Sequence, residues 1–343
     1  MPDDDRPLIL VDPWPRTLER ICDAPTRARL EALGRLVVHE DGRMPAEMVE
    51  RHLPEAVAIV GQTDLDAGRL ARAPRLRAIL NVEGNLLPNV DYAACFARGI
   101  HALVASPAFA PAVAETALGM ALDLSRGISA ADRAMRAGAE RYQLEGNRDA
   151  FLLHGATVGL VGFGDLARAL LELLVPFGCR VLAHDPWLPD LVVEAAGARP
   201  AGLEQVLSAS RVLFVLAVPT TENAAMLGRR ELELLAPGAV VVLMSRAAVV
   251  DFEALVDLAA AGRLRAGIDV WPEEPVPADH PARHVDGLLL SPHLAGAMPE
   301  AFQAIGRLVV ADLELILRGL PPVACRRAER ETVGRLRARP VDR

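Results

Sequence analysis

The chain is 343 residues long, 52% hydrophobic but only 4% aromatic, with a formal net charge of −8 at pH 7. This length favours two domains, the low aromatic content favours aliphatic α/β layers over a β-sandwich, and the acidic balance disfavours nucleic acid as a partner. All basic residues apart from histidine are arginines, which excludes Schiff-base catalysis, a P-loop lysine and a lysine general base.

The first part of the chain predicts a small α/β domain. Short apolar runs typical of buried parallel strands alternate with stretches of helical spacing. We expect strands over 7–11, 36–39, 56–60, 76–81 and 100–104, and helices over 26–33 and 92–98. One long helix is then predicted over 112–137, with Gly127 as a potential break, and it would connect this domain to a second α/β unit.

The strongest motif follows this connector. An apolar strand at 157–161 leads into the turn Gly162-Phe163-Gly164-Asp165-Leu166-Ala167, a G-x-G-x-x-A pattern, and then into helical spacing. Asp185 lies 21 residues after Gly164, where dinucleotide-binding folds carry the acid that accepts from the ribose hydroxyls. We expect Gly162, Gly164, Asp165 and Leu166 to face a pyrophosphate. The Asp185 carboxylate favours NAD over NADP, because it would repel a 2′-phosphate.

Strands and helices keep alternating after Asp185. We expect strands over 212–218, 239–244, 266–270 and 288–290, and helices over 202–208, 230–235, 252–261 and 299–317. We therefore predict an α/β fold with two Rossmann-like domains: a doubly wound parallel-sheet NAD domain, residues 109–298, inserted into a flavodoxin-like substrate domain, residues 1–108 and 299–330.

Three charged or titratable side chains follow strands of the second domain at the edge where such sheets bind ligands. Arg246 follows the strand at 239–244, Glu274 the strand at 266–270, and His293 the strand at 288–290. Arginine offers a planar fork to a carboxylate, and a glutamate beside a histidine fixes the imidazole tautomer. This combination suits acid–base chemistry on a hydroxyl–carbonyl pair.

These separated motifs resemble the D-isomer-specific 2-hydroxyacid dehydrogenase family, which includes phosphoglycerate, hydroxypyruvate and D-lactate dehydrogenases. The match runs from about Asn81 to Ala297 and includes Val113-Ala114-Glu115, the glycine turn, Pro219-Thr220-Thr221, Ser245-Arg246, residues 268–275 and Ser291-Pro292-His293. The resemblance implies hydride transfer between NAD and a D-2-hydroxy acid or 2-keto acid, in a homodimer, with no metal.

The resemblance also implies roles for individual residues. Arg246 matches the substrate-binding arginine, His293 the proton donor and acceptor, and Glu274 the acid that partners it. On the cofactor side, Asp269 matches the residue that holds the nicotinamide carboxamide, and the motif with Pro219 and Thr221 belongs to the same site. The substrate carboxylate would lie on a loop containing Gly84, Asn85 and Leu86, together with Arg246.

Three departures from the family pattern do not change the expected reaction class, but they leave the identity of the substrate undetermined. Leu86 stands where a glycine is usual, and Leu243 where an asparagine is usual, three residues before Arg246. Asp165 replaces a basic or neutral residue beside the pyrophosphate, which we expect to weaken cofactor binding unless its side chain points outward. Formate oxidation is disfavoured, because that branch of the family pairs its histidine with glutamine.

An alternative from another class stays open. Corepressors that resemble the C-terminal-binding proteins keep the same three residues on the same scaffold, so the chain could instead be a non-catalytic NAD(H)-sensing binding protein. Residues 331–343 are predicted to be a basic C-terminal tail that is frayed or docks on a partner.

The sequence also bears on the compartment. The four cysteines are scattered without a C-x-x-C pair, which favours buried reduced thiols. No apolar segment reaches 18 residues without a charge, and the acidic first residues lack the basic region of a signal peptide. We therefore expect a cytoplasmic protein without membrane or nucleic-acid partners.

Overall fold

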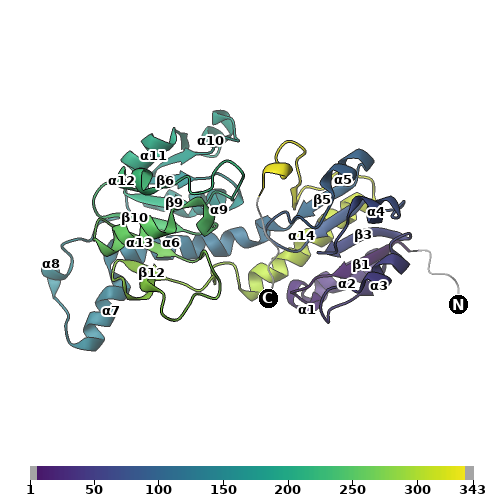
Figure 1. The fold of residues 1–343 in the computed structure, drawn as a ribbon, viewed down its shortest axis with the longest axis horizontal. Helices are drawn as coiled ribbons and strands as arrows, with labels where there is room; N and C mark the ends of the chain where they lie inside the picture. Colours follow the sequence, from purple (N-terminus) through teal and green to yellow (C-terminus); the bar gives the residue numbers. More distant parts are fainter. Residues whose placement is uncertain (1–5, 337–343) are drawn as a thin grey trace. The chain divides into compact units, whose positions relative to one another are not determined.

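The computed structural model describes residues 6–336, which divide into two compact units (Figure 1). Unit 1 contains the chain up to Phe109 and the chain from Met298 onward. Unit 2 is the continuous segment Ala110–Ala297 inserted between them.

Unit 1 is built on a six-stranded sheet with the order β13-β5-β4-β3-β1-β2. Its five parallel strands follow the flavodoxin-like order 2-1-3-4-5. They are β1 (Leu8–Asp12), β2 (Arg35–Val38), β3 (Ala56–Gly61), β4 (Ala78–Asn81) and β5 (His101–Val104). The two-residue strand β13 (Arg326–Arg327) pairs antiparallel with β5 and closes that edge of the sheet.

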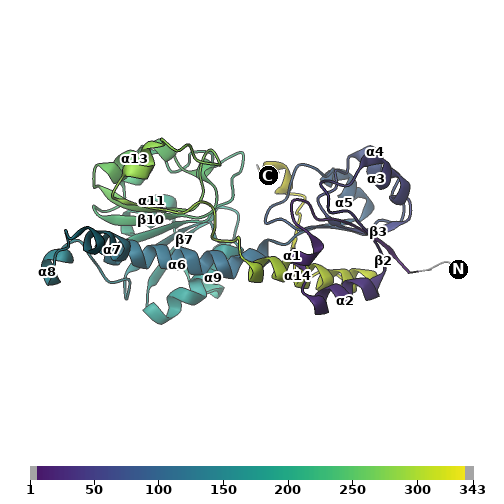
Figure 2. The same cartoon turned by 90° about the horizontal axis from the view of Figure 1, so that it is seen from below.

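Helices cover both faces of this sheet (Figure 2). One layer holds α1 (Leu18–Ile21), α2 (Ala24–Leu33) and α14 (Pro299–Leu317), and the other holds α3 (Ala46–His52), α4 (Ala67–Ala71) and α5 (Tyr92–Arg98). Side chains alternate between the two faces along a strand, so Ile9 of β1 joins the core under the first layer and Leu10 the core under the second. The 3₁₀ helix η1 (Ser106–Phe109) ends the first pass of the chain through unit 1.

Unit 2 contains a fully parallel seven-stranded sheet with the order β12-β11-β10-β9-β6-β7-β8. Its strands are β6 (Thr157–Val161), β7 (Arg180–His184), β8 (Arg199–Pro200), β9 (Val212–Val215), β10 (Ala239–Leu243), β11 (Leu264–Ile268) and β12 (Leu288–Leu290). The order reverses between β6 and β9, and such a switch point is where doubly wound sheets bind ligands. The predicted fold class is confirmed.

The helices of unit 2 form two layers as well. The layer with α6 (Ala110–Arg126) and α9 (Asp165–Leu174) packs on one face, and α11 (Leu203–Ala209), α12 (Arg229–Glu233) and α13 (Phe252–Ala260) pack on the other. The remaining helices are α7 (Ile128–Ala137), α8 (Gln143–Gly146) and α10 (Asp190–Ala195), with short 3₁₀ turns at η2 (Val175–Phe177), η3 (Ala247–Val249), η4 (Pro281–His284) and η5 (Val333–Arg335).

Several predicted elements need correction. The single long helix over 112–137 is two helices, α6 and α7, because Gly127 takes a left-handed conformation with φ +67° that bends the chain there. The strand predicted over 212–218 ends at Val215 and the one over 266–270 spans Leu264–Ile268, since apolar loop residues continue the hydrophobic run beyond the ladder. The short helices α1, α3, α4, α8 and α10 and the two-residue strands β8 and β13 were not predicted.

A buried carboxylate anchors the chain after α14. Asp312 is fully buried and accepts from the backbone N–H groups of Val323, Ala324 and Cys325 at 2.7–2.8 Å. The chain then forms β13, and the N–H of Ala328 donates to the carbonyl of Ala102. Part of the segment predicted as a basic tail, up to residue 336, thus lies within the described structure, and residues 337–343 lie outside the described residues.

Replacing Asp312 with asparagine is expected to lower the free energy of unfolding by about 2–3 kcal/mol, because one charge-assisted hydrogen bond is lost and an NH₂ group faces a backbone donor. Urea unfolding followed by circular dichroism measures this. The matched control is Glu314→Gln on the same helix, whose ion pair with Arg29 is solvent-exposed and contributes at most about 1 kcal/mol. Equal losses in both variants would contradict the anchoring role.

All four thiols are free, and the predicted burial is confirmed for Cys22, Cys95 and Cys325, whereas Cys179 is partly exposed. Burial raises the pKa of Cys22 and of Cys95 to about 11, so both thiols stay protonated near neutral pH. Within residues 6–336, no helix combines the length and apolar character needed to span a bilayer.

Candidate active site

The glycine turn joins β6 to α9 at the switch point of the unit 2 sheet. Gly162 has φ +91°, and a Cβ added there would lie 2.6 Å from the backbone of Ala217, so only glycine fits where this turn approaches the end of β9. Gly164 caps α9 without any side-chain hydrogen bond. The N–H groups of the first turn and the positive end of the ten-residue helix are therefore not covered by a capping side chain, which suits an anion such as a pyrophosphate.

Asp185 lies at the end of β7, beside this turn. Its carboxylate accepts from the N–H of Phe163 at 2.8 Å and from the N–H of Trp187 at 3.0 Å. Each oxygen keeps a further lone pair, which can accept from a ribose hydroxyl. The donor set of the turn and this acid therefore fits a dinucleotide. Asp165 and Leu166 occupy the first turn of α9 and are partly exposed, so the negative charge of Asp165 lies at the anion-binding end of the helix.

The loop after β9 carries Pro219 and Thr221. Asn223 closes this loop: its side chain accepts from the N–H of Thr220 at 2.7 Å and donates to the carbonyl of Val218 at 2.8 Å. Because β9 and β6 are neighbours in the sheet, the loop follows the strand next to the one that enters the glycine turn. Thr221 is exposed and Pro219 partly buried.

His293 and Glu274 are in contact. The Nδ1 atom of His293 lies 2.8 Å from Oε2 of Glu274, and Oε1 of Glu274 accepts from the N–H of Trp271 at 3.1 Å. A hydrogen bond from Nδ1 to the carboxylate leaves Nε2 as the ring atom for proton exchange. His293 has φ +56°, a left-handed conformation in which histidine is more common than most residues. Both side chains are partly exposed.

Asp269 holds the loop that carries His293. Its carboxylate is 1% exposed and accepts from the Ser291 hydroxyl, from the N–H of Leu294 at 2.9 Å and from the N–H of Ala295 at 3.2 Å. The sequence predicted contact with the nicotinamide for Asp269 and did not suggest this loop contact. One feature of the sequence could have indicated this contact: Asp269 and Ser291 each directly follow one of the two adjacent strands β11 and β12.

Arg246 follows β10, so the three side chains come from consecutive neighbouring strands, β10, β11 and β12. Its guanidinium donates a hydrogen bond to the carbonyl of Ser245 at 2.6 Å. Burial lowers the pKa of Arg246, and the nearby charge of Glu274 acts in the opposite direction. The result is a desolvated cation beside the His293–Glu274 pair, suited to bind a carboxylate or a keto oxygen.

The predicted substrate loop with Gly84, Asn85 and Leu86 belongs to unit 1 and is fixed at both ends. Before it, buried Glu83 forms an ion pair with Arg16 and accepts from the Gln62 amide at 3.2 Å. After it, the Asn89 side chain donates to the carbonyls of residues 62 and 63. The guanidinium of Arg16 also lies over the Phe109 and Phe302 rings, at 5.6 and 4.9 Å.

Sequence reasoning missed the Arg16–Glu83 pair, whose members are 67 residues apart. Gly84, Asn85 and Leu86 themselves are partly exposed, and a Cβ on Gly84 would meet the Phe109 ring at an ordinary 3.4 Å. Arg246, Glu274 and His293 belong to unit 2, whereas this loop belongs to unit 1.

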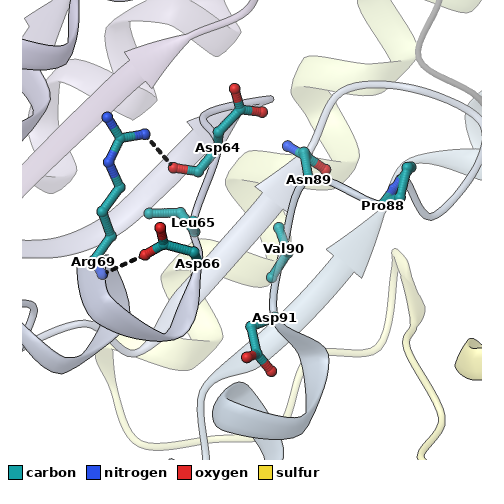
Figure 3. A pocket seen from close by; sticks show the side chains of 8 residues that line it. All are labelled: Asp64, Leu65, Asp66, Arg69, Pro88, Asn89, Val90 and Asp91. Carbon is teal, nitrogen blue, oxygen red and sulfur yellow. Dashed lines mark hydrogen bonds between the residues drawn. The ribbon is translucent and has the colours of Figure 1, made fainter.

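A cavity of about 470 Å³ in unit 1 lies beside the same loop and is lined by three aspartates and Arg69 (Figure 3). Its carboxylates serve local structure: Asp66 caps α4 by accepting from the N–H of Arg69, and Asp91 caps α5. Arg69 donates to the backbone carbonyl of Asp64 and pairs with Glu50. Among residues 6–336, no group of three or more His, Cys, Asp or Glu side chains is arranged to hold a metal ion.

Comparisons with known proteins support the family resemblance. The family model described as "D-isomer specific 2-hydroxyacid dehydrogenase, NAD binding domain" matches residues 118–295. A D-3-phosphoglycerate dehydrogenase from Archaeoglobus fulgidus is 29% identical over 81% of this chain and 53% of its own length, so the chain spans about half of that relative. A glyoxylate reductase from Pyrococcus furiosus is 30% identical over 83% of this chain and 87% of its own.

A solved structure extends the similarity over nearly the whole chain. A phosphoglycerate oxidoreductase from Rhizobium etli superposes with a TM-score of 0.87 at 44% identity, covering 96% of this chain and all of that one.

Proposed function

Because this chain belongs to the D-isomer specific 2-hydroxyacid dehydrogenase family, we propose that it is an NAD-dependent oxidoreductase that interconverts a 2-keto acid and a D-2-hydroxy acid. One observation carries the proposal: His293 contacts Glu274 at 2.8 Å, and Arg246 follows a strand at the same edge of the sheet. An acid–base pair beside a desolvated cation matches what the reduction of a keto acid needs.

The cofactor and the residues His293, Glu274 and Arg246 have separate roles in this reaction. The nicotinamide, when bound, supplies the hydride that adds to the keto carbon. His293 gives a proton from Nε2 to the keto oxygen, which becomes the hydroxyl of the product, and takes it back in the oxidation direction. Glu274 holds the ring orientation and stabilises the imidazolium form. Arg246 binds the carboxylate or keto oxygen and fixes the substrate orientation.

The glycine turn and Asp185 would hold the cofactor. Two backbone N–H groups hold the Asp185 carboxylate in place, so it would face a 2′-phosphate as a fixed negative charge. Asp269 keeps an acceptor position that a carboxamide could use. Its contacts with Ser291 and two backbone groups support a second role, positioning the His293 loop.

A panel of 2-keto acids tests the proposed function. We expect the full chain to oxidise NADH in the presence of at least one of glyoxylate, pyruvate, hydroxypyruvate and phenylpyruvate, measured by the loss of nicotinamide absorbance. We also expect kcat/KM to be higher with NADH than with NADPH by about 100-fold, because the phosphate meets the Asp185 charge at close range.

No turnover of any acid, with NADH still bound tightly, would contradict the enzyme and favour the NAD(H)-sensing alternative. Equal use of both cofactors would contradict the role of Asp185 but leave the reaction class intact. Homodimerisation stays an expectation that the family resemblance implies, and a cytoplasmic location stays an expectation from the sequence composition.

A further inference from the structure

Two cavities flank the substrate loop of unit 1. The charged residues that line the first, acidic cavity of about 470 Å³ are Asp64, Asp66, Asp91 and Arg69. The second cavity, about 290 Å³, is lined by Leu86, Leu87, Pro88, Val90, Tyr92, Val333, Gly334 and Leu336. Pro88 and Val90 line both cavities, so the loop forms the wall between them.

The second cavity is lined mostly by residues with apolar side chains and adjoins the proposed substrate-binding backbone. Leu86 belongs to both, since it lies in the substrate loop and lines the cavity. Among residues 6–336, no charged residue lines this cavity, and the one polar side chain of its lining is satisfied: the Tyr92 hydroxyl donates to the carbonyl of Leu87. Burial raises the pKa of Tyr92, so the phenol stays neutral.

The far wall of this cavity comes from the C-terminal segment, and this segment is anchored. Asp312 fixes residues 323–325, β13 pairs with β5, and the Arg330 guanidinium lies 5.5 Å from the Phe96 ring of α5. The turn η5 then presents Val333 to the cavity. The wall is therefore part of the folded unit, although it lies about 250 residues after Leu86 in the sequence.

We propose that the cavity is a side-chain pocket, which takes the apolar side chain of the 2-keto acid whose carboxylate binds at the substrate loop. This inference rests on the proposed function. Leu86 links the two sites directly. A cavity of roughly 150 Å³ accepts benzene, so about 290 Å³ holds an aromatic or branched aliphatic group. An anionic side chain such as a phosphate ester is disfavoured, because among residues 6–336 no cation lines this cavity to pair with it.

The test is a ratio of specificity constants. We expect kcat/KM for phenylpyruvate to exceed that for pyruvate by at least about 100-fold, because one methylene in a fitting pocket contributes on the order of tenfold and the phenyl group adds the equivalent of more than two. Val333→Trp should fill the pocket and lower this ratio at least tenfold. The matched control is Val323→Trp, on the same segment but highly exposed, which should leave the ratio unchanged.

Three outcomes overturn the pocket while leaving the proposed function intact: a ratio near one in the unaltered chain, a folded Val333→Trp variant with an unchanged ratio, or a preference for a phosphorylated 2-keto acid over phenylpyruvate. If thermal unfolding shows that Val333→Trp does not fold, Val333→Ala replaces it, with an expected loss of about threefold as one pocket wall recedes.

A binding measurement separates the two proposals. If no acid is turned over, the proposed function fails, and quenching of bound-NADH fluorescence by phenylpyruvate then decides the pocket. Saturable quenching that Val333→Trp weakens at least tenfold supports the pocket. Absent quenching, or equal quenching in both proteins, overturns it.

Discussion

Replacing His293 with glutamine is expected to lower kcat for the best 2-keto acid by about 10³-fold, since a positioned general acid–base group contributes roughly 10²–10⁴-fold. Glutamine cannot give its proton to a keto oxygen and take it back. The glycine turn and Asp185 do not depend on His293 for any contact, so the affinity for NADH, measured by fluorescence titration, should stay within about twofold.

The backbone at this position calls for a second variant. His293 has a left-handed conformation, which asparagine adopts more readily than glutamine. If His293→Asn is as inactive as His293→Gln, the loss comes from the missing proton transfer and not from a displaced loop. His284→Gln, an exposed histidine of the same unit, is the control and should keep full activity. A His293→Gln variant with more than about a tenth of the activity would contradict the assignment.

Replacing Arg246 is expected to have the second largest effect. Arg246→Met should lower kcat/KM for a 2-keto acid by about 10²–10³-fold, comparable to the loss of one preorganised donor to a developing oxyanion. Arg246→Lys should recover only part of this loss, because a single ammonium cannot replace the planar fork. Steady-state kinetics of both variants, with NADH saturating, measure the effect.

The control for Arg246 is Arg229→Lys in the same unit. Arg229 forms an exposed ion pair with Asp257, so its substitution should change kcat/KM by less than about twofold. Because Arg246→Met also removes a positive charge that interacts with Glu274, thermal unfolding of each variant should accompany the kinetics. Activity of Arg246→Lys within about threefold of the unaltered chain would contradict a bidentate role.

Much of unit 2 could be predicted because its signals are local. The strand, glycine turn and helix around Gly162 follow each other without interruption, and parallel strands bring their carboxyl ends to one edge. That rule alone places residues after β10, β11 and β12 next to each other, as the contact between His293 and Glu274 illustrates. Boundaries were less predictable, since apolar residues after Val215 continue the pattern of the strand.

Features that depend on distant pairing could not be predicted. The ion pair of Arg16 with Glu83 joins a turn to a loop, and neither residue stands in a pattern that points to the other. The sequence alone does not distinguish whether the Asp269 carboxylate contacts a cofactor or the 291–295 loop. The C-terminal segment is rich in arginine, which is typical of a solvated tail, and its anchoring by Asp312 is visible only in three dimensions.

The two-residue strand β13 also bears on how the protein avoids self-association. Without it, β5 (His101–Val104) would be the last strand of the unit 1 sheet. Its unpaired backbone N–H and C=O groups could then pair with strands of other molecules. β13 covers that ladder and places two exposed arginines, Arg326 and Arg327, at the new margin, where their charges repel an approaching copy. Ending the chain before β13 would therefore expose the edge of β5 and promote aggregation through edge-to-edge strand pairing.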